Sequence, residues 1–253
     1  MGLDPSRTAA AIEARLRAQS SRERAESEKR DLKSELKHLG ATVWQIRREA
    51  RSFAADHSEL SHAELVALVE ALWSQPVHER RVAAAMVLEA YPELVGPRDL
   101  PLLERLVREA RTWALVDVLA GEVIGEMLVR HPGAAAKLDR WARDSDFWVR
   151  RAALLAMLEP LRNGAPFARF ARYADAMLEE KEFFIRKAIG WVLRETGKSR
   201  PDEVFEWLAP RADRASGVTI REAVKYLEPD QRQALLGAYG KTAVGGAAGR
   251  VRS

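Results

Sequence analysis

The sequence predicts an all-α protein organised as an α-solenoid, a stack of helical hairpins, and three observations lead to that prediction. The alternation of Val, Ile, Thr and Tyr that marks strands is nearly absent, whereas Ala, Leu, Arg and Glu dominate at helical spacing. Every second predicted helix carries the same short motif at a nearly constant interval. Breaks containing Pro or Gly separate the helices, at Gln75-Pro76, Gly96-Pro97, His131-Pro132-Gly133, Asn163-Gly164, Arg200-Pro201 and Ser216-Gly217.

The repeated motif is a short frame of an aromatic residue, a basic pair and an alanine, with copies spaced 34, 35, 35, 36 and 35 residues apart. A fixed period of this size is typical of stacked helical hairpins, in which the repeated helix lines a common concave side or a common core. The tryptophan, Gly-Tyr and proline signature of tetratricopeptide repeats is absent, so the frame is closer to HEAT-like repeats of reduced length. The copies are WQIRREA from Trp44, HERRVAA from His78, WALVDVL from Trp113, WVRRAAL from Trp148, FIRKAIG from Phe184 and TIREAVK from Thr219.

The repeats predict a single domain over residues 1–240, closed by a charged helix around Ser21–His38 at one end and by Pro229–Tyr239 at the other. The stretch before Ser21 is helical by pattern. The tail over residues 241–253 has the glycines of a flexible, weakly basic end, and we expect Thr242–Ser253 to be disordered. A solenoid with capped ends is usually a monomer, which is the expected oligomeric state.

Composition limits the chemistry available to this chain. It contains no cysteine, which excludes disulfides, thiolate nucleophiles and thiolate metal sites. The formal net charge of +4 and the pI of about 9.5 permit nucleic-acid binding without requiring it. The start, MGLDPSRTAA, lacks the basic and apolar regions of a signal peptide, and no apolar run reaches the roughly 18 residues that a membrane span needs. We therefore expect a cytoplasmic protein without a membrane partner.

Basic residues at the third and fourth motif positions would form a row along stacked repeats. Such a row suits a phosphate backbone, because Lys and Arg neutralise phosphates and release counterions. The alternative is that these side chains cap helices or bridge to acids in the next repeat. The Trp113 repeat interrupts the row with Leu115 and Val116. The predicted DNA-binding cations are Arg80, Arg81, Arg150, Arg151, Arg186, Lys187 and Arg221.

One carboxylate stands out within the predicted helix Thr112–Arg130, which is apolar on nearly all sides. Asp117 projects away from Glu122 and Glu126, which mark the solvated face, and lies one turn after Trp113. Burial of an unpaired carboxylate is costly, so an acid at this place needs either a catalytic role or a partner, for which Arg150 or Arg151 are the candidates. At the same motif position, the other repeats from His78 onwards have small apolar residues, namely Val82, Ala152, Ala188 and Ala223.

Two tryptophans are further site candidates. Trp113 shares the face of Asp117, and Trp191 directly follows Gly190, where backbone or a ligand can approach closely. Trp148 is interpreted as core. The histidines are interpreted as scattered or loop residues that form no metal site, and no phosphate-binding or nucleophile-elbow motif occurs, so neither a metal nor a cofactor is expected.

On these residues the chain resembles the bacterial DNA alkylation repair glycosylases of the AlkD type, which are built from HEAT-like repeats. The resemblance runs from about Lys29 to Tyr226. It is densest in TWALVD (112–117), FWVRRAALL (147–155) and EFFIRKAIGWVLRE (182–195). It implies a C-shaped, right-handed all-α solenoid whose concave basic face holds duplex DNA.

The resemblance implies that Asp117 is the catalytic acid, that Trp113 and Trp191 contact the sugar, and that Arg151 is a functional arginine. The implied activity is hydrolysis of the N-glycosidic bond of N3- and N7-alkylated purines without base flipping, which leaves an abasic site. Some relatives excise bulky minor-groove adducts in antibiotic self-resistance. The alternative function is a non-catalytic HEAT-like scaffold or a DNA-damage-binding protein.

The sequence departs from the family near Leu39-Gly40. The family often has a tyrosine and a polar residue around this step, and the alignment places Asp31 and Thr42 at those positions. An aromatic wall of the cleft is therefore expected to be missing, which predicts a wider cleft or one suited to another adduct.

Overall fold

The computed structural model describes residues 2–248, with side chains described for residues 2–240. The all-α prediction is confirmed: no strand occurs in the described residues, and an isolated parallel bridge joins Lys37 to Val77. The chain forms two compact units, Met1–Ala134 and Ala135–Ser253. The single domain over residues 1–240 stays a prediction. No helix within residues 2–248 has the length and apolar character needed to cross a membrane.

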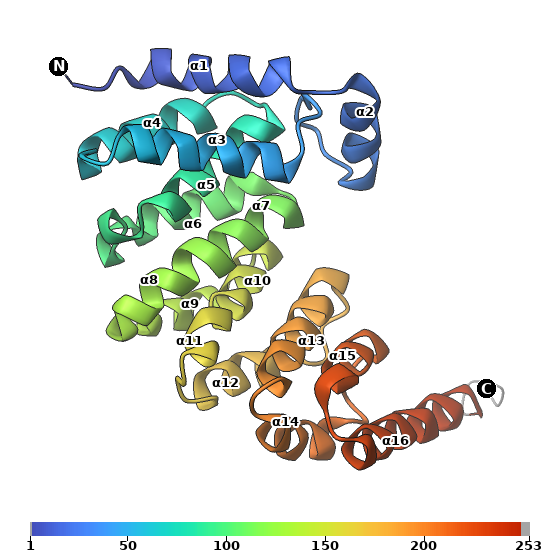
Figure 1. Cartoon of the computed structure of the whole chain (residues 1–253). Helices are drawn as coiled ribbons and strands as arrows, with labels where there is room; N and C mark the ends of the chain where they lie inside the picture. The colour runs from blue at the N-terminus through green and yellow to red at the C-terminus, as the bar shows by residue number, and fades with distance from the viewer. Residues whose placement is uncertain (1, 249–253) are drawn as a thin grey trace. The chain divides into compact units, whose positions relative to one another are not determined.

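In Met1–Ala134 the helices pack in consecutive layers (Figure 1). α5 is central, because it packs against both α3 and α4, and α1 packs on α4. Capping boxes start α3, through Thr42 and Gln45, and α4, through Ser61 and Glu64. The helices are α1 (Pro5–Ala18), α2 (Arg22–Asp31), α3 (Val43–Asp56), α4 (His62–Trp73), α5 (His78–Ala90), α6 (Leu100–Ala110), α7 (Trp113–Asp117), the π-helix η3 (Val118–Ile124) and α8 (Gly125–Arg130).

In Ala135–Ser253 the central element is α13, which packs against α10, α14 and α15 (Figure 1). Asp146 and Glu182 begin α10 and α13, since each side chain accepts a hydrogen bond from a backbone N–H of its helix. The helices are α9 (Leu138–Trp141), α10 (Phe147–Leu155), α11 (Leu158–Arg162), α12 (Ala168–Met177), α13 (Phe183–Gly197), α14 (Pro201–Leu208), α15 (Gly217–Ala223) and α16 (Pro229–Ala248).

The predicted helical repeat is confirmed in both units. Each of the six motif copies begins within the first three residues of a helix, in α3, α5, α7, α10, α13 and α15 in that order. The small apolar residues at the fifth motif position are buried, as close packing requires: Val82, Ala152, Ala188 and Ala223.

Three segments differ from the predicted elements. Thr112–Arg130 is not one α-helix, because α7 ends at Asp117 and a π-helical stretch follows, in which the angle per residue differs from that of an α-helix. The charged helix around Ser21–His38 ends at Asp31, and residues 32–42 form an irregular connection. At the C-terminus, α16 continues to Ala248, over part of the tail expected to be disordered, and residues 249–253 lie outside the described residues.

Candidate functional site

Trp113 and Asp117 are the first and last residues of α7, one helical turn apart. Trp113 is 43% exposed, and Asp117 is half-buried. Between them, Leu115 and Val116 are fully buried. The two apolar residues that interrupt the cation row therefore anchor α7 to the core, and the helix presents an aromatic ring and a carboxylate on its accessible side.

In Ala135–Ser253, Trp191 is a half-buried residue of α13. The close approach predicted at Gly190 is confirmed, and the protein's own backbone makes it. A Cβ atom at Gly190 would lie 2.8 Å from Cβ of Glu222 and 3.1 Å from Cα of Thr219. Trp191 therefore directly follows a point of close packing between α13 and α15.

Trp148 belongs to the core, as predicted. It is buried, and its ring lies 4.5 Å from that of Phe147 and 5.0 Å from that of Phe184, measured between centroids. Its neighbour Arg151 is 2% exposed and donates a hydrogen bond to the carbonyl oxygen of Phe184. This repeat thus uses its aromatic residue and one of its arginines to join α10 to α13.

In the first unit, Arg80 is 8% exposed and fully engaged within the protein. It donates to the carbonyl oxygens of Leu72 and Ala71 at the end of α4, at 3.2 and 2.6 Å, and forms an ion pair with Glu13 at 2.8 Å. The next residue, Arg81, donates to the carbonyl oxygen of Glu109 at 2.9 Å. Both arginines therefore act as caps on neighbouring helices.

In the second unit, Arg150 forms a two-pronged ion pair with Glu180, with nitrogen–oxygen distances of 3.0 and 2.8 Å, and also donates to the carbonyl oxygens of residues 144 and 145. Arg186 donates to the carbonyl oxygen of Glu180. Lys187 pairs with Glu222 of the next repeat at 2.6 Å.

Glu222 forms ion pairs with Lys187, Arg194 and Lys225. Burial disfavours its charged form, but hydrogen bonds from Lys187 and Lys225 and the charge of Arg194 outweigh burial and lower the pKa of Glu222 to about 2. Glu222 is therefore ionised at neutral pH and neutralises part of the cation row.

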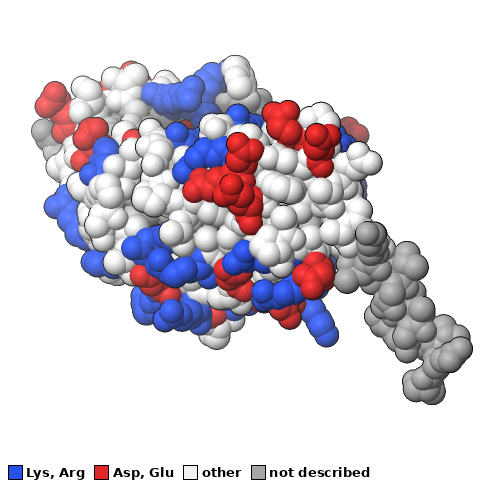
Figure 2. All heavy atoms as spheres, turned by 90° about the horizontal axis from the view of Figure 1, so that it is seen from below, with Lys and Arg blue, Asp and Glu red and all other residues white. Residues whose placement is uncertain are grey.

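Of the seven predicted DNA-binding cations, Arg221 is exposed and has no side-chain hydrogen bond or ion pair within residues 2–240. The other six make the helix-capping and inter-repeat contacts that were the alternative interpretation. On the face drawn in Figure 2, Lys and Arg side chains are likewise interspersed with Asp and Glu. DNA binding by the row stays a prediction.

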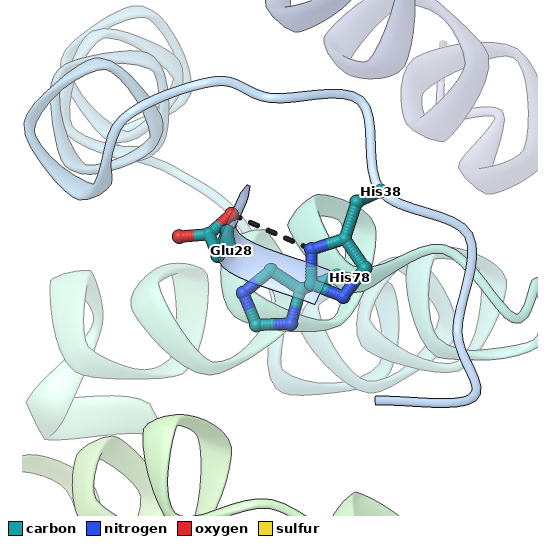
Figure 3. A group of neighbouring side chains, drawn as sticks. All are labelled: Glu28, His38 and His78. Atoms are coloured by element: carbon teal, nitrogen blue, oxygen red, sulfur yellow. Dashed lines mark hydrogen bonds and ion pairs between the residues drawn. The ribbon is translucent and has the colours of Figure 1, made fainter. Parts of the chain in front are cut away.

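The interpretation of His38 and His78 as scattered residues is wrong (Figure 3). Their rings stack with centroids 4.4 Å apart, and Nδ1 of His38 lies 3.4 Å from a carboxylate oxygen of Glu28. Ligand atoms of the three residues lie within 4.8 Å of one another, which is close enough for a metal ion. However, the nitrogen lone pairs of stacked rings lie in two nearly parallel planes and do not converge on a point between the rings, and Arg24 also pairs with Glu28. The geometry fits a hydrogen-bonded contact between α2, the connection 32–42 and α5.

The Leu39-Gly40 step is fixed by a buried acid. Glu79 is 0% exposed and accepts hydrogen bonds from the backbone N–H groups of Leu39, at 2.9 Å, and Gly40, at 2.6 Å. Of the two departures from the family, Asp31 is the exposed last residue of α2, and Thr42 caps α3.

Trp44, the second residue of α3, was not predicted as a site residue. It is 66% exposed, and the Arg48 guanidinium lies 4.7 Å from its ring centroid. Its place in the repeat frame, equivalent to that of Trp113, was the signal that could have identified it.

A family model and solved structures both relate this chain to DNA alkylation repair proteins. The family model described as DNA alkylation repair enzyme matches residues 12–227. The fold is similar to that of a predicted DNA alkylation repair enzyme from Enterococcus faecalis, with a TM-score of 0.75 and 21% identity over 83% of this chain and 98% of that one. It is also similar to AlkD2 from Streptococcus mutans, with a TM-score of 0.64 and 16% identity over 89% of this chain and 100% of that one. No curated protein sequence matches.

Proposed function

Because the chain belongs to the DNA alkylation repair enzyme family, we propose that it is a monofunctional glycosylase that hydrolyses the N-glycosidic bond of N3- or N7-alkylated purines in duplex DNA. Family membership gives it a role in DNA alkylation repair, with DNA as its partner. The observation that carries the finer proposal is Asp117, a half-buried carboxylate one turn from the exposed ring of Trp113. A small apolar residue would pack better at this motif position, as in the neighbouring repeats.

The proposed reaction needs no general acid to protonate the leaving base. Alkylation at N3 or N7 gives the purine a formal positive charge, so it leaves without being protonated. As the bond between C1′ and the purine nitrogen breaks, its electron pair goes to that nitrogen and the base departs neutral. The deoxyribose becomes an oxocarbenium-like cation, water adds to C1′, and loss of a proton gives the abasic site. Stabilisation of the cationic sugar is therefore the catalytic requirement.

Asp117 is suited to that requirement. Its carboxylate would oppose the positive charge that develops near C1′ and orient the attacking water. The Trp113 ring would pack on the deoxyribose and add a cation–π attraction to the same charge. For Trp191, in Ala135–Ser253, the resemblance implies a similar sugar contact. Because these roles address the sugar, the base need not be flipped into a pocket, and bulky adducts can be substrates.

Arg151, which the resemblance implies as functional, has little surface for contact with a phosphate. Since it is 2% exposed and donates to the carbonyl oxygen of Phe184, its proposed role is to position α10 against α13.

A strand-nicking assay tests the proposal. Duplex DNA with a single N7-methylguanine is incubated with the protein and then treated with hot alkali, which cleaves at abasic sites. Wild type is expected to nick the strand. Asp117→Asn is expected to bind the duplex as wild type does and to lose about 100-fold or more in excision rate, a typical cost of removing one electrostatic stabiliser. Glu126→Gln, a half-buried acid later in the same helical segment, is the matched control and should retain activity.

The possible outcomes separate the glycosylase from its alternatives. Equal excision by wild type and Asp117→Asn would contradict the role of Asp117. Absence of nicking by either, repeated with a bulky N3 or N7 adduct, would favour the damage-binding protein or the scaffold. The scaffold also predicts that Asp117 is a structural partner, so that Asp117→Ala costs roughly 3–5 kcal/mol of stability, as for a broken buried pair.

A further inference from the structure

A pocket in Met1–Ala134 has an excess of positive charge. It has a volume of about 590 Å³ and lies between residues 33–36, α5 and the end of α6. Its charged lining residues are four cations and two acids, which gives 4 − 2 = +2. They are Lys33, Arg81, Arg108 and Arg111, with Glu35 and Glu109.

Two of these cations stand on strained backbone. Lys33 and Arg111, with φ angles of 49° and 48°, are the non-glycine residues with positive φ in the described part of the chain, and both line this pocket. The left-handed conformation is unfavourable for such residues but commonly ends a helix: Arg111 is the C-cap of α6, and Lys33 directly follows the C-cap of α2. Both side chains are exposed, and neither makes an ion pair within residues 2–240.

A third cation, Arg81, is partly buried, and its contacts within the protein do not satisfy all of its N–H groups. Its Nη1 donates to the carbonyl oxygen of Glu109, and its guanidinium carbon lies 5.0 Å from the ring centroid of Trp73, but its Nε is buried without a hydrogen-bond partner. Burial lowers the pKa of Arg81, and the charge of Glu109 only partly opposes this effect. A nearby anion would stabilise this partly desolvated cation.

We propose that this pocket binds a backbone phosphate of DNA through Lys33 and Arg111, with Arg81 adding positive charge from its wall. The inference rests on the proposed function insofar as the ligand is DNA. Arg111 is two residues before Trp113, so a phosphate bound here would lie beside the helix that carries Asp117. Arg108 already pairs with Glu104 at 2.8 Å, and Lys33 and Arg111 are therefore the cations to test.

The test measures binding of undamaged duplex DNA at several salt concentrations, by fluorescence anisotropy. Lys33→Asn and Arg111→Asn remove the charge, while Asn tolerates the left-handed backbone. Each variant is expected to weaken binding about 3- to 10-fold and to reduce the slope of log K against log salt by about 1 for a lost phosphate contact. Lys33→Arg and Arg111→Lys should restore binding. Arg7→Gln, which removes an exposed charge from α1, should leave the slope close to that of wild type.

Wild-type affinity and slope in the Lys33→Asn/Arg111→Asn double variant, with an unchanged melting temperature, would overturn the proposal. A second arm adds inorganic phosphate to the free protein. If phosphate stabilises wild type but not the double variant while DNA binding is equal in both, the pocket takes free phosphate and the backbone contact is wrong. Failure of the glycosylase proposal is separate: it would appear as lack of excision even though DNA binding still depends on Lys33 and Arg111.

Discussion

The imidazole rings of His38 and His78 stack face to face, with centroids 4.4 Å apart and planes within 10° of parallel (Figure 3). His38 belongs to the connection 32–42, and His78 is the first residue of α5. Nδ1 of His38 contacts Glu28 of α2, a helix with no buried residue. Because α2 has no apolar face to bury, polar contacts of this kind hold it on the rest of Met1–Ala134.

This stack predicts a pH-dependent stability. Burial and the nearby charges of His38 and Arg24 lower the pKa of His78 from 6.5 to about 4, against the opposing effect of Glu28. The folded state therefore binds fewer protons than the unfolded state between these values, and stability is lost as the pH falls from about 6.5 to about 4. The loss from His78 is at most about 3 kcal/mol. Melting temperatures measured from pH 7.5 to 4.5 should fall accordingly.

A variant separates this contribution from general acid denaturation. His78→Phe keeps an aromatic ring against His38 but cannot be protonated, so its melting temperature should change less across the same pH range. His131→Gln, which replaces an exposed histidine, should follow wild type. Equal losses of stability in wild type and His78→Phe would show that His78 is not the titrating group.

A second prediction concerns the buried acid that holds the same connection. Glu79→Gln places an amide where two backbone N–H groups, of Leu39 and Gly40, now meet a carboxylate, so one or both lose their acceptor. The expected cost is about 1–3 kcal/mol of unfolding free energy. Denaturant titration gives the cost, and limited proteolysis should show faster cleavage within residues 22–42. The exposed Glu23→Gln is the matched control, and equal behaviour of the two variants would contradict the prediction.

The helical repeat could be predicted because each repeat carries the same short local motif, which recurs about every 35 residues. The partners of the cations could not. Arg150 reaches an acid 30 residues further on, and Lys187 one 35 residues further on, so the same repeat that aligns the cations also supplies their acids. The pattern of charges in the sequence alone does not distinguish cations paired with acids of the next repeat from a row of cations available to bind phosphate.

Two further structural features could not be predicted from the sequence. The π-helical turn after Asp117 changes the direction of the following side chains, and nothing in the sequence led us to expect that turn. The contact between His38 and His78 depends on the path of the irregular connection 32–42, which lies outside the repeat. In contrast, the position of Asp117 one helical turn after Trp113 required only helical spacing to predict, and that position is confirmed.

A third prediction tests the close packing beneath Trp191. Gly190→Ala places a methyl group 2.8 Å from Cβ of Glu222, so α13 and α15 must separate, at a cost of about 1–3 kcal/mol. Gly197→Ala is the matched control in the same helix, because its methyl group would be 3.4 Å from a side-chain atom of Leu227. It should be close to neutral. Thermal melts measure both variants, and equal stability would contradict the tight packing.

The last prediction separates the exposed tryptophan from the buried one in the same motif position. Trp113→Ala truncates a residue that is 43% exposed and should lower stability only slightly, whereas Trp148→Ala leaves a cavity in the core and should cost about 3–5 kcal/mol. If Trp113 packs on the deoxyribose, its loss should also reduce excision of N7-methylguanine under saturating enzyme, at a temperature where both variants are folded. Trp148→Ala should then excise at nearly the wild-type rate, since its ring packs on Phe147 and Phe184. Single-turnover excision rates measure the catalytic contribution of each tryptophan, and thermal melts measure its contribution to stability. A variant Trp113→Ala that is stable and fully active would remove this ring from the proposed mechanism and leave Asp117 to stabilise the sugar cation without it.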